Sequence, residues 1–271
     1  ANATPESVPK RAQVVEYLRQ FTYHATALDA YLRCPLKFYY RYVLGLKEKE
    51  EVAGDIDSGD VGSFVHDVLK LFFKDLIGTQ LKPSDLEERR LKAIIDRQYT
   101  EWFGEEDTGA RHVLKQQVRS QLERFLIQHQ LPLCLNETVT LLELESKIPR
   151  LALNSFVFSG KLDRVERRGE KIYIIDYKTG GDEKWLGVNF EKLVVDQRET
   201  WGEAVNSLQL AMYAMLYAES RNERIEKIVP AYLMLGRNRF DEKMEVKLFD
   251  DPLVARSQYD QLQAVIFGLL E

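Results

Sequence analysis

The stretch IIDYKTG, residues 174–180, decides the fold, because it ends an apolar strand with an aspartate and a lysine two positions apart. Successive residues of a strand point to opposite faces, so Asp176 and Lys178 share one face while Tyr177 points to the other. A strand-end ion pair followed by a Thr-Gly turn is the structural interpretation. The functional interpretation is a site that needs the charges of Asp176 and Lys178 in one small volume.

The strand before this stretch carries a second aspartate, Asp163. If the hairpin turn is centred between Arg168 and Gly169, residue 163 lies opposite Ile174, and opposed residues point to the same face. Asp163 and Asp176 then become diagonal neighbours, with Cβ atoms about 7–8 Å apart. The sequence therefore predicts two carboxylates on one face of the hairpin.

Two carboxylates on one face repel each other unless a cation or a proton intervenes. Val165, Ile172 and Ile174 make the same face apolar, which increases that cost. A Mg²⁺ or Mn²⁺ ion would remove it, and Lys178 is suited to hold, and take a proton from, a water that attacks a phosphorus atom. A purely structural salt-bridge cluster is the alternative, and the two aspartates together with the lysine favour the metal site.

Composition narrows the class of protein. At 271 residues and 45% hydrophobic content the chain can bury a sizeable core. Neither a bilayer-spanning apolar run nor a signal pattern is found in the sequence, so we expect a cytoplasmic protein that does not enter a membrane. The net charge of -5 argues against a protein that coats nucleic acid, but it allows a local basic groove around an acidic centre. The first residue is Ala rather than Met, so we expect a piece of a longer protein.

Residues 1–22 read as a linker that becomes helical near VVEYLRQ, and residues 23–271 as one domain. Residues 26–46 are predicted to form a helix that has Thr26 at its N-cap, Asp29 as capping-box partner and Gly45 at its end. Residues 84–130 predict two or three amphipathic helices, a helical insertion. The remaining predictions are helices over 62–77, 207–220 and 252–271, and strands over 138–153, 155–168, 170–180 and 225–235.

Five motifs in order carry a resemblance. GKLDRVE and IIDYKTG follow GSFVHDVL and precede QLAMY, and the opening is TALDAYLRCPLKFYYRYVLGL. From about residue 22 to the end, this pattern resembles the PD-(D/E)XK nuclease superfamily, and is most similar to the RecB/AddB-type nuclease domains of bacterial helicase-nucleases. The resemblance implies an α/β fold: a restriction-endonuclease-like core with a small mixed β-sheet flanked by helices, plus the helical insertion.

The same resemblance implies roles for individual residues. Asp163 and Asp176 match the family's two metal-binding aspartates, and the backbone carbonyl of Tyr177 would complete the ligands of that strand pair. His66, in the pattern GSFVH, matches an additional metal-binding histidine. Lys178 matches the catalytic lysine. His66 also lies at helical spacing among apolar residues, which fits an ordinary core histidine.

Three further positions match supporting elements. Gln209 and Tyr213 match a Q-x-x-x-Y element thought to support the site and its substrate, and their i, i+4 spacing puts them on one helix face. Ordinary helix packing is the alternative. Glu145, or with a weaker match Glu143, corresponds to an acidic residue on the strand before the hairpin.

The predicted first helix mixes basic and aromatic residues. Arg33, Lys37 and Arg41 are candidate DNA contacts, because Phe38 and Tyr40 beside them could stack on the bases of a single strand. An amphipathic helix with a solvated face explains the same pattern.

Some relatives in the family bind an iron-sulfur cluster through one cysteine in the first helix and three near the C-terminus. Cys34 matches the first of these, but the only other cysteine is Cys134. We therefore expect no iron-sulfur cluster from the cysteines in these residues. Either this lineage lacks the cluster or the sequence ends before the closing cysteines.

Together, the residues and the resemblance predict a Mg²⁺-dependent deoxyribonuclease of DNA repair or recombination. We expect an exonuclease that acts on single-stranded DNA or on free ends, as a module of a larger helicase-nuclease with a helicase-like domain or subunit as partner. The alternatives are a catalytically inactive DNA-binding or scaffold module of the same fold, and a CRISPR-adaptation-type nuclease.

Overall fold

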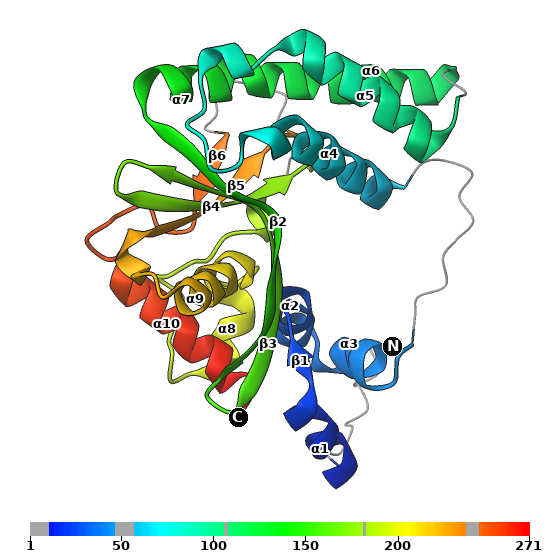
Figure 1. Ribbon diagram of the computed structural model, residues 1–271. Helices are drawn as coiled ribbons and strands as arrows, with labels where there is room; N and C mark the ends of the chain where they lie inside the picture. Colours follow the sequence, from blue (N-terminus) through cyan, green and yellow to red (C-terminus); the bar gives the residue numbers. More distant parts are fainter. Residues whose placement is uncertain (1–10, 47–56, 106–107, 181–182, 237–243) are drawn as a thin grey trace.

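The computed structural model describes residues 11–46, 57–105, 108–180, 183–236 and 244–271. Within them, strands form one mixed sheet with helices against both faces (Figure 1). The strands are β1 (Thr22–Tyr23), β2 (Val139–Leu153), β3 (Phe156–Arg168), β4 (Lys171–Lys178), β5 (Ile228–Met234) and β6 (Glu245–Lys247). The α/β fold with a small mixed sheet is confirmed.

The helices form two layers (Figure 1). Helices α4 to α7 cover one face of the sheet, while α9 and α10, with α8 and α2 beside them, cover the other. The helices are α1 (Ala12–Gln20), α2 (Ala25–Arg33), α3 (Pro35–Phe38), α4 (Ser58–Phe73), α5 (Glu88–Phe103), α6 (Gly109–Arg124), α7 (Leu131–Asn136), α8 (Arg198–Ala204), α9 (Gln209–Arg221) and α10 (Ala255–Gly268). Two π-helical turns extend α3 and α6, Tyr39–Val43 and Phe125–Gln130.

β3 is the central strand of the sheet. The strand order is β1-β3-β4-β5-β6, and β2 also pairs with β3. The β2–β3, β3–β4 and β5–β6 pairs are antiparallel, whereas β1–β3 and β4–β5 are parallel. The three predicted antiparallel strands are therefore β2, β3 and β4.

Side chains of β4 alternate between the two cores, as a strand buried on both faces requires. Ile172 and Ile174 pack in the core under α9 and α10. Ile175 and Tyr177 pack in the core under α4, α5 and α6. The last residues of β4 therefore lie where the two helical layers approach the same strand end.

Most predicted elements are present. The helix expected near VVEYLRQ is α1, and the helical insertion comprises α5, α6 and the π-helical turn after α6. The short strands β1 and β6 and the helix α8 were not predicted, because two to seven residues carry too little periodic signal. No helix in the described part of the chain combines the length and apolar character needed to cross a bilayer.

The single helix predicted over residues 26–46 is wrong in two respects. Cys34 has extended backbone angles and interrupts the helix, because Pro35 begins a new one and disfavours a helical residue before it. Thr26 lies inside α2, whose N-cap is His24, so no capping box joins Thr26 to Asp29. Gly45, with a φ of 67°, follows the last helical turn as predicted.

The predicted hairpin register is also wrong, by two positions. Val165 pairs with Ile174 and Arg168 with Lys171, so the turn is Gly169–Glu170. The paired ladder ends at Arg164, the residue after Asp163. A shift by two leaves the paired residues on their predicted faces, because side chains alternate with a period of two. Asp163 lies one residue beyond the paired ladder; its carboxylate contacts His66 of α4 and the backbone N–H of Tyr177, whereas Asp176 contacts Gln209 of α9.

Charged residues of β3 are buried on the face that packs against α4. Glu166 is fully buried between two arginines: Arg168 Nε donates to Glu166 Oε1 at 2.6 Å, and Arg164 Nη2 lies 2.5 Å from Glu166 Oε2. Arg168 Nη1 also lies 2.8 Å from Glu245 Oε2. The guanidinium of Arg164 lies over the ring of Phe73. This network joins the sheet to the layer of α4.

Glu166→Gln removes the charge that both arginines share. We expect a loss of about 3–5 kcal/mol in the free energy of unfolding, because two buried guanidinium groups lose their partner. Urea unfolding of the variant and of wild type measures it. Asp75→Asn is the control, since Asp75 pairs with Arg90 on the surface and its loss should cost less than about 1 kcal/mol. Equal costs for the two variants would contradict the prediction.

Glu245 predicts a pH dependence of stability. Burial favours its neutral form, but His129 and Arg168 outweigh burial and lower its pKa from 4.5 to about 2. A depressed folded-state pKa stabilises the fold above the unfolded-state pKa, and that stability is lost as the pH falls from about 4.5 to about 2. Glu245→Gln should therefore be less stable than wild type at pH 7, and the difference in urea midpoints should shrink between pH 5 and about pH 3. A difference independent of pH would contradict this.

Candidate metal centre

Three side chains from three elements converge beside the end of β4. His66 of α4, Glu145 of β2 and Asp163 of β3 each offer one ligand atom, and these atoms lie within 4.8 Å of one another. His66 Nδ1 is 3.3 Å from Asp163 Oδ1 and 3.6 Å from Glu145 Oε1. One imidazole and two carboxylates at this spacing are a set of ligands that a divalent cation accepts.

His66 is held in place by α4 and β4. The neighbouring residues Val65 and Leu69 are buried in the core below α4, so the helix presents His66 to the end of the sheet. His66 Nε2 lies 3.2 Å from the carbonyl oxygen of Tyr177, and the two rings meet edge to face. The predicted metal-binding carbonyl is therefore next to the predicted metal-binding histidine.

Glu145 reaches the cluster through an unusual backbone conformation. Its φ is 47°, in the left-handed region that residues with a Cβ rarely adopt, and it lies within β2 between Leu144 and Ser146, which pair regularly with β3. Such strain persists only where surrounding contacts hold it, and it is common at functional sites. Lys161 of β3 forms an ion pair with Glu145.

The charges of the cluster perturb one another. Burial disfavours the charged ring of His66, but Asp163 and Glu145 outweigh burial and raise the pKa of His66 to about 10. Burial likewise favours neutral Glu145, but His66 and Lys161 outweigh it and lower the pKa of Glu145. The carboxylates of Asp163 and Glu145 therefore strongly favour a positive charge between them, which is the electrostatic requirement of a cation site.

Asp163 is fixed by the backbone of the neighbouring strand. Its Oδ2 accepts a hydrogen bond from the backbone N–H of Tyr177 at 2.9 Å, while Oδ1 faces His66. One carboxylate therefore ties β3, β4 and α4 together.

Asp176 and Lys178 form a second group with α9. Lys178 Nζ lies 2.8 Å from Asp176 Oδ2 and donates to Gln209 Oε1 at 2.7 Å. Gln209 Nε2 donates to Asp176 Oδ1 at 2.9 Å and to the hydroxyl of Tyr213 at 3.0 Å. Lys178 also lies over the ring of Tyr232. The amide of Gln209 thus bridges the lysine and the aspartate.

The donor atoms give the test of whether a cation fits. Asp176 Oδ2 is buried with Lys178 Nζ 2.8 Å away as its positive neighbour, and burial together with the charge of Asp163 raises the pKa of Asp176. A buried carboxylate is stabilised by positive charge close to it. Together with the imidazole and the two carboxylates of the cluster, this chemistry fits a divalent cation.

Gly160 allows α9 to lie close to β3. A Cβ at this position would lie 3.0 Å from a methyl carbon of Leu216 and 3.5 Å from the ring of Tyr213. A side chain here would push away the helix that carries Gln209. Packing therefore explains the glycine of the GKLD motif, because a residue without a side chain lets the helix approach the strand closely.

The remaining predicted positions are placed as follows. Glu143 does not contact the cluster through its carboxylate, because both carboxylate oxygens accept hydrogen bonds from Arg221. Arg33, Lys37 and Arg41 are exposed; Arg33 donates to the carbonyl of Asn206, and Arg41 stacks on Tyr42. The structure thus brings Glu145 rather than Glu143 to the site.

Lys161 and Tyr232 touch the site but were not predicted. Lys161 lies two residues before Asp163, so the alternation of the strand was a usable signal. Tyr232 pairs with Asp176 across the parallel β4–β5 ladder, and no short-range pattern reveals that register.

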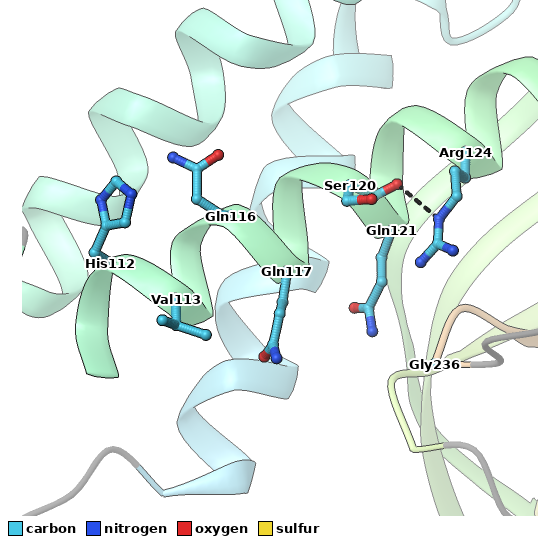
Figure 2. A pocket seen from close by; sticks show the side chains of 8 residues that line it. All are labelled: His112, Val113, Gln116, Gln117, Ser120, Gln121, Arg124 and Gly236. Atoms are coloured by element: carbon cyan, nitrogen blue, oxygen red, sulfur yellow. Dashed lines mark hydrogen bonds between the residues drawn. The ribbon is translucent and has the colours of Figure 1, made fainter. Parts of the chain in front are cut away.

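A cavity of about 550 Å³ lies beside α6 (Figure 2). Gln121 and Arg124 lie on the side of α6 that faces Gly236, and Arg124 Nε donates to the carbonyl of Ser120. The other lining residues are His112, Val113, Gln116, Gln117 and Ser120. Among the described residues, those that line it include no carboxylate.

The sequence of this chain matches a protein-family model. The model of the PD-(D/E)XK nuclease superfamily covers residues 24–270, which include every residue of the two groups described above. The chain belongs to the PD-(D/E)XK nuclease superfamily.

Curated relatives of this superfamily member share one description, that of a subunit of an ATP-dependent helicase/deoxyribonuclease. The chain is 26% identical over 282 residues to the protein so described from Clostridium perfringens strain SM101, a match that covers 90% of this chain and 23% of the relative. It is 24% identical over 264 residues to the protein of the same description from Carboxydothermus hydrogenoformans, covering 89% and 23%. The chain thus spans about a quarter of the length of these relatives.

The end of β4 depends on a close approach of two backbones. The N–H of Leu235 donates to the carbonyl of Lys178 at 2.8 Å, and the next residue, Gly236, lies against Thr179. A Cβ at Gly236 would overlap the carbonyl oxygen of Thr179 and lie 2.8 Å from its carbon. Backbone atoms cannot move aside as a flexible side chain can.

Gly236→Ala should therefore destabilise the nuclease fold, by about 1–3 kcal/mol, the usual cost of forcing atoms into a packed site. Gly180→Ala is the matched control, because a Cβ there meets nothing within 4 Å. We expect the control to stay within about 0.5 kcal/mol of wild type in urea unfolding. A loss in Gly236→Ala no larger than that of the control would refute the backbone contact.

Proposed function

We propose that this chain is a metal-dependent DNA nuclease that hydrolyses phosphodiester bonds. The observation that carries the proposal is the convergence of His66, Glu145 and Asp163 beside the Asp176–Lys178 pair. In a structural salt-bridge cluster His66 would serve only as a charged partner, whereas here its imidazole, two carboxylates and a backbone carbonyl oxygen converge on one small volume. Membership of a nuclease superfamily supports the same conclusion.

His66, Glu145, Asp163, Asp176 and the carbonyl of Tyr177 are the groups we propose for holding Mg²⁺ or Mn²⁺. Oxygen-rich ligand sets with one imidazole suit these ions. When bound, such an ion would supply positive charge that offsets the carboxylates and the negative charge developing on a phosphate.

Lys178 is the proposed catalytic residue. Its ammonium is held by Asp176, Gln209 and the ring of Tyr232, so its position is fixed before a substrate arrives. Two of its three N–H donors are directed at Asp176 and Gln209, which leaves the third to orient a water or a phosphate oxygen. Gln209 and Tyr213 support this group rather than touch the phosphate.

The proposed substrate is DNA, because the relatives are described as helicase/deoxyribonuclease subunits. We propose exonucleolytic action on single strands or free ends, in DNA repair or recombination. The chain would act as one module of a larger cytoplasmic helicase-nuclease, with a helicase-like domain or subunit as partner. The proposed strand contacts are the exposed residues Arg33 of α2, Lys37 of α3 and Arg41 of the π-helical turn after α3.

The test is cleavage of end-labelled linear DNA, single- and double-stranded, with Mg²⁺, with Mn²⁺ or with EDTA. We expect cleavage that requires the divalent ion and falls about 10²–10⁴-fold in Lys178→Ala, the usual size of a lost proton-transfer or orienting group. Lys171→Ala is the matched control, because Lys171 lies at the other end of the same strand and donates to Glu226. It should cleave at the wild-type rate.

Metal binding is tested separately by calorimetric titration with Mn²⁺. His66→Ala and Asp163→Asn should weaken the affinity by about tenfold or more. Binding of DNA without cleavage by the wild-type chain would instead support an inactive scaffold module. Cleavage that persists in EDTA would contradict the proposed dependence on a metal ion.

A further inference from the structure

Helix α9 begins without a side-chain cap of its own. Its N-cap is Leu208, which offers no polar side-chain atom, and its first turn has no acidic residue. The first N–H groups of a helix have no partner inside it and need acceptors from elsewhere. Because Gln209 is the first residue of α9, the way this end is held determines where the bridging amide lies.

Asp29 of α2 supplies the missing acceptor. Its Oδ1 accepts from the backbone N–H of Leu208 at 2.7 Å, and its Oδ2 accepts from the hydroxyl of Ser207 at 2.8 Å. Ser207 Oγ in turn accepts from the backbone N–H of Gln209 at 3.2 Å. A carboxylate at a helix N-terminus also interacts favourably with the helix dipole. The cap is therefore provided by a residue 179 positions earlier in the chain.

A second contact from α2 strengthens the same junction. Arg33 Nη2 donates to the carbonyl of Asn206 at 2.9 Å. The hydroxyl of Tyr232 lies 3.4 Å from Ser207 Oγ, which links the junction to the strand beneath Lys178. The segment that precedes α9 is thus held from α2 at Asn206, at Ser207 and at Leu208.

We propose that Asp29 is a positioning residue for Lys178 and Asp176, acting through the N-terminus of α9 and the side chain of Gln209. This inference rests on the proposed nuclease function of the site. Asp29 forms its hydrogen bonds with Ser207 and Leu208 rather than with Lys178 or the cluster of His66, Glu145 and Asp163, and it senses Lys178 only through the charge of that residue. Without it the first turn of α9 loses its cap, and the amide that bridges the two charged groups loses its fixed position.

The kinetic test is single-turnover cleavage at saturating DNA and Mg²⁺. Asp29→Ala should lower the rate constant about tenfold to a hundredfold, the cost of a small misplacement of a catalytic group, with DNA affinity unchanged within about twofold. Ser207→Ala should lower it in the same direction. Asp29→Asn should recover most of the rate, because its amide oxygen can still accept from Leu208. If Asp29→Ala does not fold, these two variants carry the test.

A double-mutant cycle separates positioning from general stability. In the background of Gln209→Ala, Asp29→Ala should change the rate by less than about twofold, because the group through which it acts is gone. Multiplying losses would instead mean that Asp29 does not act through Gln209. Arg221→Ala is the control at the other end of α9, where it removes the pairing with Glu143, and it should leave the rate near wild type.

Hydrogen exchange followed by NMR gives a readout that does not depend on cleavage. In Asp29→Ala, the Leu208 backbone N–H and the Gln209 side-chain amide should exchange at least about tenfold faster, while amides near Arg221 stay protected. Unchanged exchange at Leu208 and Gln209 overturns the inference. A wild-type chain that cuts no DNA overturns the proposed function instead, and the exchange rates still decide whether Asp29 holds Gln209.

Discussion

Repulsion between carboxylates at one end of the sheet is the constraint on which the rest of the structure depends. Glu145, Asp163 and Asp176 come from three adjacent strands, and two like charges about 4 Å apart cost about 4 kcal/mol at an effective dielectric constant of 20. The fold offsets this cost with positive groups that depend on both helical layers: His66 comes from α4, and Lys178 is held by α9. Both layers must therefore pack correctly before the strand end is stable.

The sequence alone was sufficient for residues whose position follows from strand alternation. Asp176 and Lys178 share a face because they lie two positions apart on one strand. The register error was an even number of positions, so the paired residues of β3 and β4 kept their predicted faces. Glu145 could be matched only loosely from the sequence. Its contact with His66 depends on a φ of 47°, and nothing in the local sequence signals a left-handed residue in mid-strand.

Local rules failed where a distant partner competed with them. Thr26 and Asp29 have the spacing of a capping box, but Asp29 instead accepts hydrogen bonds from Ser207 and Leu208. A pattern of four residues cannot reveal a partner so far along the chain. Pro35, by contrast, was a readable local signal for the break at Cys34, and the apolar periodicity across it concealed that signal.

The order of the site residues along the chain has a consequence for synthesis. A ribosome releases His66 and the strand carboxylates well before Gln209, the residue that bridges Asp176 and Lys178. Domains fold as units while the N-terminal part emerges first. A nascent chain that ends before α9 therefore has these acidic residues and Lys178 but lacks the amide that joins Lys178 to Asp176, so translation itself delays this contact until α9 has been made.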